Sequence, residues 1–236
     1  YGYLRIFSFD VTSAEGFVDE CCALLAQLPS EGLVIDVRGN PGGNILAAES
    51  LLQLFTPRHI QPMPFQFANT PLTLELCKQH AHTNGPGLSL YPWVDSIRQS
   101  VQTGAPHSIA VPITPEEQAN QMGQRFYGRS ILITDPLCYS ATDIFAAGFQ
   151  DHQIGEVLGV GGRTGAGGAN VWQHALLTGL LHDVPGTPFE PLPLDTAMSV
   201  SIRRALRVGK QAGTLLEDYG VAPDVIHEMT RNDILG

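Results

Sequence analysis

The sequence predicts an α/β protein with a mixed, largely parallel sheet, and three observations support this fold class. The runs GLVIDVRG (32–39) and SILITD (130–135) are short and almost continuously apolar, as expected of strands buried on both faces. Segments with helical periodicity follow both runs. A glycine-rich break, NPGGN (40–44), separates the first run from its helix. Strands that alternate with helices are typical of parallel sheets.

The first quarter of the chain is predicted to form strand, helix, strand and helix in turn. YGYLRIFSF (1–9) has the aromatic and β-branched residues of a strand. In SAEGFVDECCALLAQLP (13–29) the apolar residues recur at helical spacing, with Ser13 as the N-cap and Pro29 as the terminator. After the first buried run, ILAAESLLQLF (45–55) resumes the helical period.

Residues 57–125 depart from this pattern. They are rich in proline and polar residues, and we expect short helices at LTLELCKQHA (72–81) and VDSIRQSVQT (94–103) within an otherwise irregular insertion. The length of the chain suits one substantial domain. We therefore expect a single domain over residues 1–236 that carries a proline-rich insertion.

The regular pattern returns after the insertion. SATDIFAAGFQDH (140–152) is predicted to be a helix, and EVLGVGG (156–162) a buried strand that runs into the glycine loop RTGAGG (163–168). We expect ANVWQHALL (169–177) to continue as a strand, and MSVSIRRALRV (198–208) to be a strand or a helix.

Composition limits the partners. The formal net charge is −10 and no dense cluster of Lys and Arg appears, which disfavours nucleic acid and anionic membrane surfaces. No apolar run reaches membrane-spanning length. The four cysteines form no C-x-x-C pair or zinc spacing, and no motif implies a cofactor, so we expect neither a metal site nor a cofactor. Adjacent Cys21 and Cys22 are expected to be packing residues. The sequence leaves undecided whether two of the four cysteines form a disulfide.

The opening YGYLRIFSF lacks the basic region, apolar core and cleavage site of a signal peptide. It begins directly on a predicted strand. We therefore expect the chain to be a fragment or a processed product, and its compartment stays undetermined.

Ser140 lies at a predicted strand-to-helix junction and has two interpretations. Ser-Ala-Thr-Asp (140–143) has the S-x-x-D pattern in which a hydroxyl and a carboxylate satisfy the free N–H groups of a helix start. A serine beside free N–H donors and the positive end of the helix dipole can instead act as a nucleophile. The N–H of Ala141 would then stabilise an oxyanion. The sequence lacks G-x-S-x-G, which disfavours an α/β-hydrolase elbow.

The loop DVRGNPGGN (36–44) also has two interpretations. Gly42 and Gly43 supply positive φ angles for a tight turn, or they let the backbone approach a ligand with N–H groups aimed at an oxyanion. The loop lacks the lysine and the spacing of a phosphate loop. Arg38 and Asp36 are expected to form a structural ion pair.

The other candidates are weak when taken alone. RTGAGG makes a turn by default, and Glu217, in LEDYGVAPD, is by default a solvated acid before a glycine turn. Each histidine is by default an exposed side chain, or one whose ring nitrogens already have hydrogen-bond partners, rather than a general base. The eight histidines are His59, His80, His82, His107, His152, His174, His182 and His227.

Taken in order, five segments resemble peptidase family S41, the tail-specific or C-terminal processing proteases and their tricorn-like relatives. GYLRIFSF (2–9) is similar to the opening strand after the family's PDZ-type module, and GLVIDVRGNPGGN (32–44) to its D-x-R-x-N-x-G-G loop. CYSATDIFAAGFQDH (138–152) resembles the nucleophile segment, and VLGVGGRTGAGG (157–168) the glycine loop after it. LEDYGVAPD (216–224) resembles the closing E-x-x-G-V-x-P-D element.

This resemblance covers about residues 1–56 and 126–236 and implies a ClpP/crotonase-like core with serine peptidase chemistry. It implies that Ser140 is the nucleophile. It also implies that the oxyanion donors are the N–H group of Gly42 or Gly43 and that of Ala141.

The proton acceptor distinguishes two branches of the family. The processing proteases use a lysine of the glycine loop, at a position that here holds Gly167. Arg163 nearby cannot lose its proton at usable pH. The tricorn-like branch uses Ser-His-Glu, and Glu217 matches its acid. Its histidine lies upstream of the PDZ-type module, before the point at which this chain begins. His152, about three helical turns after Ser140, does not match it.

The sequence therefore predicts a serine endopeptidase core that hydrolyses polypeptide through an acyl-enzyme on Ser140. We expect this chain alone to be inactive because its general base is missing. An upstream domain of the same protein is an expected partner. The sequence leaves undecided whether the protein forms a homo-oligomer. The alternative is a non-catalytic ligand- or peptide-binding module on the same fold, in which Ser140 is only a cap. An acyl-CoA enzyme of the crotonase kind is a third option.

Overall fold

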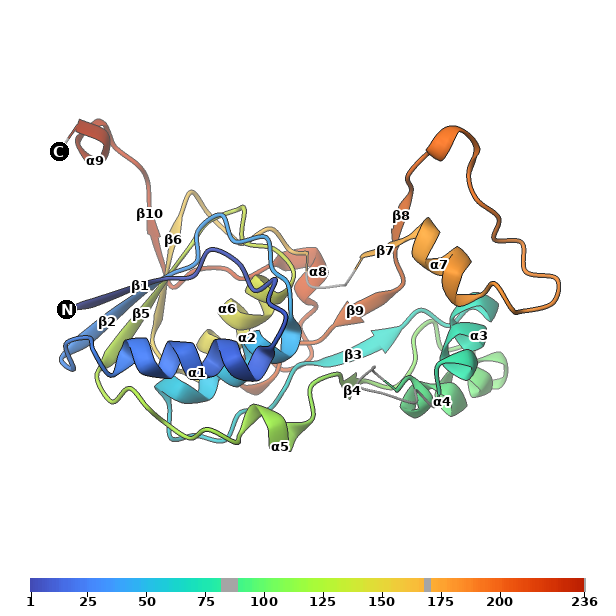
Figure 1. Ribbon diagram of the computed structural model, residues 1–236, viewed down its shortest axis with the longest axis horizontal. Helices are drawn as coiled ribbons and strands as arrows, with labels where there is room; N and C mark the ends of the chain where they lie inside the picture. Colours follow the sequence, from blue (N-terminus) through green and yellow to red (C-terminus); the bar gives the residue numbers. More distant parts are fainter. Residues whose placement is uncertain (82–88, 168–170, 236) are drawn as a thin grey trace. The chain divides into compact units, whose positions relative to one another are not determined.

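The computed structural model describes residues 1–81, 89–167 and 171–235, and it divides the chain into two compact units (Figure 1). The second unit takes in much of the expected insertion and a later segment as well. The single domain expected over residues 1–236 stays a prediction. The first unit comprises residues 1–64, 112–168 and 205–236, and the second comprises residues 65–111 and 169–204.

A five-stranded sheet forms the centre of the first unit, and every neighbouring pair of strands in it is parallel. This arrangement confirms the predicted α/β class with a largely parallel sheet. In order across the sheet, the strands are β1 (Gly2–Arg5), β2 (Gly32–Asp36), β5 (Arg129–Thr134), β6 (Glu156–Val160) and β10 (Val225–His227).

Helices α1 (Ala14–Leu25), α2 (Ile45–Leu52) and α6 (Ala141–Asp151) pack beside one another against this sheet (Figure 1). The Ser13 hydroxyl accepts the Gly16 N–H at 3.0 Å, so the predicted N-cap of α1 is confirmed. The helix ends at Leu25, before the chain reaches Pro29.

Helix α6 is the most deeply buried of the three. Ten of its 11 residues are buried, and Phe145 stacks against Phe9 at a centroid distance of 5.6 Å. A Cβ at Gly148 would lie 2.4 Å from Leu52, so the absence of a side chain there lets α6 approach α2 closely. The start of α6 is therefore held in place by the core.

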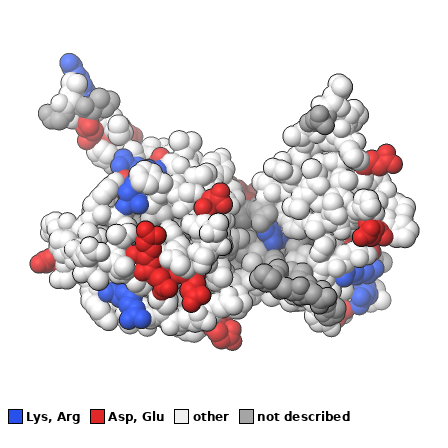
Figure 2. Space-filling model, in the orientation of Figure 1, with Lys and Arg blue, Asp and Glu red and all other residues white. Residues whose placement is uncertain are grey.

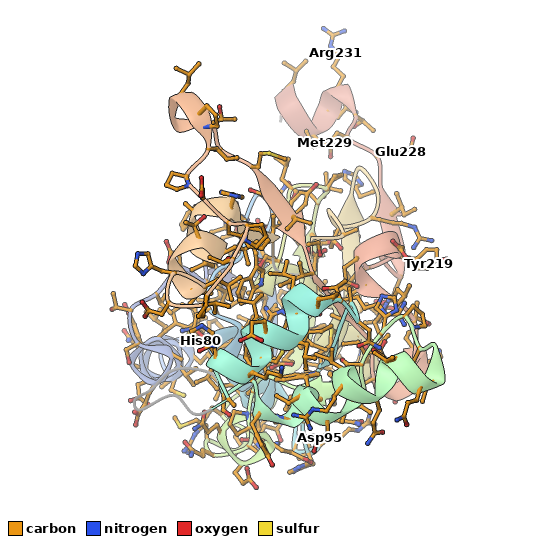
Figure 3. The ribbon with its side chains drawn as sticks, turned by 90° about the vertical axis from the view of Figure 1, so that its right-hand side faces the viewer. His80, Asp95, Tyr219, Glu228, Met229 and Arg231 are labelled. Atoms are coloured by element: carbon orange, nitrogen blue, oxygen red, sulfur yellow. The ribbon has the colours of Figure 1, made fainter. Side chains whose placement is uncertain are left out.

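The second unit contains α3 (Pro71–Gln79) and α4 (Tyr91–Thr103), which confirm the two helices expected there; His80 and Asp95 mark them in Figure 3. The strand expected over 169–177 is wrong from His174 onward. Ala169 and Asn170 lie outside the described residues, and β7 covers only Val171–Gln173. The segment HALLTGL, which is rich in residues that favour helices, folds as α7 (His174–Leu180).

The remaining elements are short. The expected strand or helix at 198–208 is two strands, β8 (Ser199–Ser201) and β9 (Arg203–Ala205). β8 pairs with β7, and β9 lies in a three-stranded sheet of order β4-β3-β9. The others are β3 (Pro64–Phe67), β4 (Val111–Pro112), α5 (Glu116–Ala119), α8 (Leu216–Tyr219) and α9 (Arg231–Leu235), with 3₁₀ turns at Gln53–Phe55, Pro193–Asp195 and Gly209–Gln211.

The surface of the first unit carries acidic side chains over α1 in the view of Figure 2, where Glu15, Asp19 and Glu20 are exposed.

In the part of the chain that the structure describes, no helix is long and apolar enough to cross a membrane. The thiols of all four cysteines are free, and Cys21 is buried whereas Cys22 is half-buried.

Asp36, the last residue of β2, is the charged centre of the sheet. Its side chain is 1% exposed and binds Arg38 at 2.7 Å, which confirms the predicted ion pair. It also accepts hydrogen bonds from Arg5 and from the Tyr3 hydroxyl, so β1 and β2 meet at this carboxylate. Burial raises the pKa of Asp36, but hydrogen bonds from Arg38 and Tyr3 outweigh it and hold the pKa at about 2.

Replacing Asp36 with Asn should lower the free energy of unfolding by about 3 kcal/mol at pH 7, because a shift of roughly two pKa units is lost. A lowered pKa stabilises the fold above the unfolded value of about 3.9, and this contribution is lost as the pH falls through about 2. The difference in unfolding free energy between the unsubstituted chain and Asp36→Asn should therefore disappear as the pH falls from about 4 to about 2. Urea unfolding at several pH values measures it. Asp19→Asn, at an exposed position, is the control, and an equal loss there would refute the prediction.

Candidate active site

The loops that follow β2, β5 and β6 converge at one edge of the sheet. Because the three strands are parallel neighbours, their carboxyl ends share that edge, where α/β proteins usually bind ligands. The loops are residues 37–44, 135–140 and 161–167. Each corresponds to a motif that the sequence had singled out.

Ser140 has a backbone conformation that disfavours the capping interpretation. Its φ of 57° and ψ of −121° lie in a region that non-glycine residues rarely occupy, at a cost on the order of 1–3 kcal/mol. Its side chain makes no capping hydrogen bond at the start of α6. The hydroxyl is therefore not used as a cap, and the half-buried serine is held in a strained turn.

Gly42 lies directly against Ser140. A Cβ on Gly42 would be 2.6 Å from the Ser140 Cβ and 2.9 Å from the Ala141 nitrogen, and its φ is +100°. Gly43 approaches the other side of the loop, where a Cβ would be 2.1 Å from the Asp10 nitrogen. The structure thus brings Gly42 against Ser140 and Ala141, with Gly43 next to it in the chain, and only glycine fits at either loop position.

The N–H groups of the two glycines differ. The Gly42 N–H donates to the Asn40 side-chain oxygen at 2.9 Å. Among the described residues, neither the Gly43 N–H nor the Ala141 N–H donates to another protein group. Of the two glycines proposed from the sequence, Gly43 is therefore the one whose N–H is available to a ligand.

Asn40 is a buried residue that the sequence reasoning missed. Its side-chain nitrogen donates to the Ile6 carbonyl at 3.1 Å, and its own carbonyl accepts the Tyr139 N–H at 3.1 Å. It thus joins the glycine loop to the residue after β1 and to the residue before Ser140. The asparagine in D-x-R-x-N was the available signal.

The glycine loop after β6 is fastened to the start of α6 by Asp143. The Asp143 carboxylate is fully buried and accepts the Ala166 N–H at 3.1 Å and the Gly167 N–H at 3.0 Å. Burial raises the pKa of Asp143 to about 6, against the opposing effect of these and other hydrogen bonds. The S-x-x-D pattern predicted that this carboxylate satisfies N–H groups at the helix start, but its bonds go to N–H groups of the glycine loop instead.

Gly167, the position compared with a catalytic lysine, has no room for a side chain. A Cβ there would be 2.2 Å from the Tyr139 ring and 3.3 Å from the Ser140 nitrogen. The Tyr139 ring occupies the space that a longer side chain would need. Gly168, the last residue of this motif, lies outside the described residues.

Glu217 lies on α8, which packs against α6 and which Tyr219 marks in Figure 3. The Glu217 carboxylate is half-buried and accepts the Ala205 N–H. After α8, the Val221 N–H donates to the Thr164 hydroxyl at 2.8 Å. Glu217 is thus joined to the segments around Ser140 through the glycine loop.

His152 is unsuited to act as the base. Its Nδ1 donates to the Gly148 carbonyl at 2.8 Å, and its Nε2 accepts the Gln61 N–H at 2.9 Å. Both ring nitrogens are therefore occupied by the backbone. His227 lies 3.3 Å from Asp233, and His82 is outside the described residues.

The fold and the motifs together define an α/β protein with a parallel five-stranded sheet whose loops carry the motifs at one edge. The chain belongs to peptidase family S41, whose model matches residues 1–227. It is also 42% identical over 57 residues to the carboxy-terminal processing protease CtpB of Bacillus subtilis, a stretch that covers 24% of this chain and 12% of CtpB.

Three solved structures have a similar fold. Mature CPAF aligns with a TM-score of 0.65 at 18% identity, over 98% of this chain and 47% of that one. A putative peptidase of Parabacteroides merdae gives 0.56 at 20% identity over 99% and 56%. The photosystem II D1 C-terminal processing protease gives 0.54 at 17% identity over 95% and 41%. The chain therefore spans about half the length of these proteins, and these likenesses show the fold.

Gly42→Ala should lower the free energy of unfolding by about 3 kcal/mol, because the new Cβ overlaps Ser140 and the backbone angle disfavours it. Gly39→Ala is the matched control in the same loop. Its φ is also positive, at +68°, but a Cβ there meets nothing within 4 Å, so the loss should be about 1 kcal/mol. Denaturant unfolding of both variants measures the difference, and equal losses would contradict the close contact.

Ser140→Gly should be more stable than Ser140→Ala by about 1 kcal/mol. Both variants remove the hydroxyl, but only glycine relieves the strain at φ 57°. Calorimetric melting temperatures of the two proteins compare them directly. If the alanine variant is equally stable, residue 140 is not strained.

Proposed function

We propose that this chain is the core of a serine endopeptidase that hydrolyses peptide bonds through an acyl-enzyme on Ser140. One observation carries the proposal. The Ser140 hydroxyl is not used as a cap, its backbone is strained, and it lies against Gly42 in a loop whose Gly43 N–H, like the Ala141 N–H, has no acceptor among the described residues. Membership of peptidase family S41 supports the same reaction.

In this mechanism the Ser140 oxygen attacks the carbonyl carbon of a peptide bond, and its proton passes to a general base. The carbonyl oxygen becomes an oxyanion, which the N–H groups of Gly43 and Ala141 stabilise. One such donor is worth roughly 3–4 kcal/mol. The C–N bond then breaks, the amine takes the proton, and water releases the acyl group from Ser140.

We propose that the base is a histidine from outside this chain and that Glu217 orients it. The exclusion of a lysine at position 167 and the engagement of His152 by backbone groups support this proposal. An upstream segment of the same protein is the proposed source. This assignment to the Ser-His-Glu branch rests on the motif around Glu217.

The non-catalytic alternative finds less support. It requires Ser140 to serve as a cap, and the side chain makes no capping hydrogen bond. The strain at this residue would then have no purpose, since a glycine would satisfy the same turn.

The isolated chain should react slowly with a fluorophosphonate probe at Ser140, because the proposed base, which would take the proton of the hydroxyl, lies outside it. Free imidazole should then accelerate labelling by about tenfold or more, by replacing the absent base. Mass spectrometry of the labelled peptides identifies the modified serine and gives the rate at each imidazole concentration.

Ser140→Ala should abolish the accelerated labelling, whereas Ser30→Ala, at an exposed position before β2, should leave it unchanged. Rapid labelling of Ser140 without imidazole would show that this chain already contains its base. Labelling of Ser140 no faster than that of other serines, even with imidazole, would refute its role as the nucleophile.

A further inference from the structure

Asp143 contacts several segments of the site although the proposed reaction does not use it. Its carboxylate lies on the first turn of α6, three residues after Ser140, and is fully buried. One oxygen accepts the Ala166 N–H at 3.1 Å, and the other accepts the Gly167 N–H at 3.0 Å. Asp143 thus joins the first turn of α6, which begins directly after Ser140, to two consecutive residues of the glycine loop.

Asp143 lies close in the chain or by hydrogen bond to two unusual backbone conformations of the site. Four non-glycine residues in the described part of the chain have positive φ, and Ser140 at 57° and Ala166 at 61° are two of them. The Ala166 N–H donates to Asp143 at 3.1 Å, and Ser140 lies three residues before Asp143 at the start of the same helix. A carboxylate suits this place because it only accepts hydrogen bonds and offers about four lone-pair sites.

The same connection reaches the segment that carries Glu217. The Thr164 N–H donates to the Val221 carbonyl at 3.2 Å, and the Thr164 hydroxyl accepts the Val221 N–H at 2.8 Å. Val221 follows α8 by two residues. Asp143 therefore lies between the serine turn and the loop that anchors the α8 segment.

We propose that Asp143 is a positioning residue that fixes the Ser140 turn and the glycine loop in the geometry needed for acyl transfer. This inference rests on the function proposed above. Asparagine has nearly the same shape, but its NH₂ group would face one of the N–H donors and release one arm of the connection. Asp143→Asn is therefore the informative substitution.

The test uses the Ser140→Cys variant of this chain as a reporter. Iodoacetamide alkylates a thiolate with release of iodide, so the alkylation rate across pH gives the pKa and the reactivity of the thiol at position 140. Mass spectrometry of the peptide that carries residue 140 follows the reaction. Cys138 in the same peptide is buried, and burial raises the pKa of its thiol to about 12, so it stays unreacted in the folded protein.

The direction of the change distinguishes positioning from simple electrostatics. Removing a negative charge near the thiol would lower its pKa and speed alkylation at pH 7. Misplacing the N–H donors of Ala141 and Gly43 would raise the thiol pKa and slow the reaction. We expect Asp143→Asn to slow alkylation about tenfold at pH 7, one pKa unit, once the rate is corrected for the folded fraction. An unchanged or faster rate would overturn the proposal.

Glu49→Gln in the same reporter is the matched control. Glu49 is another buried carboxyl of the first unit, 2% exposed on α2, and it accepts the Met63 N–H at 2.6 Å. Its replacement should leave the alkylation rate within about twofold, which is the scatter expected of a distant site.

If Asp143→Asn does not fold, amide hydrogen exchange of the unsubstituted chain decides the matter. The Ala166 and Gly167 amides should exchange far more slowly than exposed loop amides at pH 7.5, and equal rates would overturn the proposal. Alkylation and exchange require neither a general base nor a peptide substrate. A failed fluorophosphonate experiment and a failed test of Asp143 are therefore separate outcomes.

Discussion

The candidate site depends on the close approach of two backbone loops, at Gly42 and Ser140. A single methyl group on Gly42 would come within 2.6 Å of the Ser140 Cβ, so the two loops can meet only because residue 42 has no side chain. The parallel register of β2 and β5 delivers both loops to the same edge of the sheet. Asn40 then fixes their separation, since its side chain accepts the Gly42 N–H and its carbonyl accepts the Tyr139 N–H.

Two buried aspartates maintain this edge, and their surroundings shift their pKa values in opposite directions. Burial alone would raise the pKa of both. Two arginines and a tyrosine hydroxyl bind Asp36, however, and lower its pKa to about 2. Asp143 has only neutral donors, so burial prevails and its pKa rises to about 6. The first aspartate contributes a salt-bridged junction between strands. The second can organise backbone N–H groups, because an acceptor-only side chain suits several donors at once.

Much of the fold could be predicted because it follows from local patterns. Ser13 caps α1 as its position before an apolar helical period indicated, and Arg38 pairs with Asp36 two residues away. The strand predicted over 169–177 failed at His174, because an apolar run of that length fits a strand or a helix equally well. The capping interpretation of Ser140 failed for a different reason. The S-x-x-D pattern cannot reveal a positive φ, which neighbouring loops impose on the residue.

The sequence by itself determined the α/β class, the membership of peptidase family S41 and the order of the motifs, since these depend on residue types and on spacing along the chain. It left two glycines as equal candidates for the oxyanion donor. The structure shows which of the two N–H groups is already occupied, because the Asn40 side chain folds back onto the Gly42 N–H and no described residue accepts the Gly43 N–H. The role proposed for Asp143 likewise depends on Ala166 and Gly167, more than 20 residues further along the chain, which only the parallel packing of β5 and β6 brings within hydrogen-bonding distance.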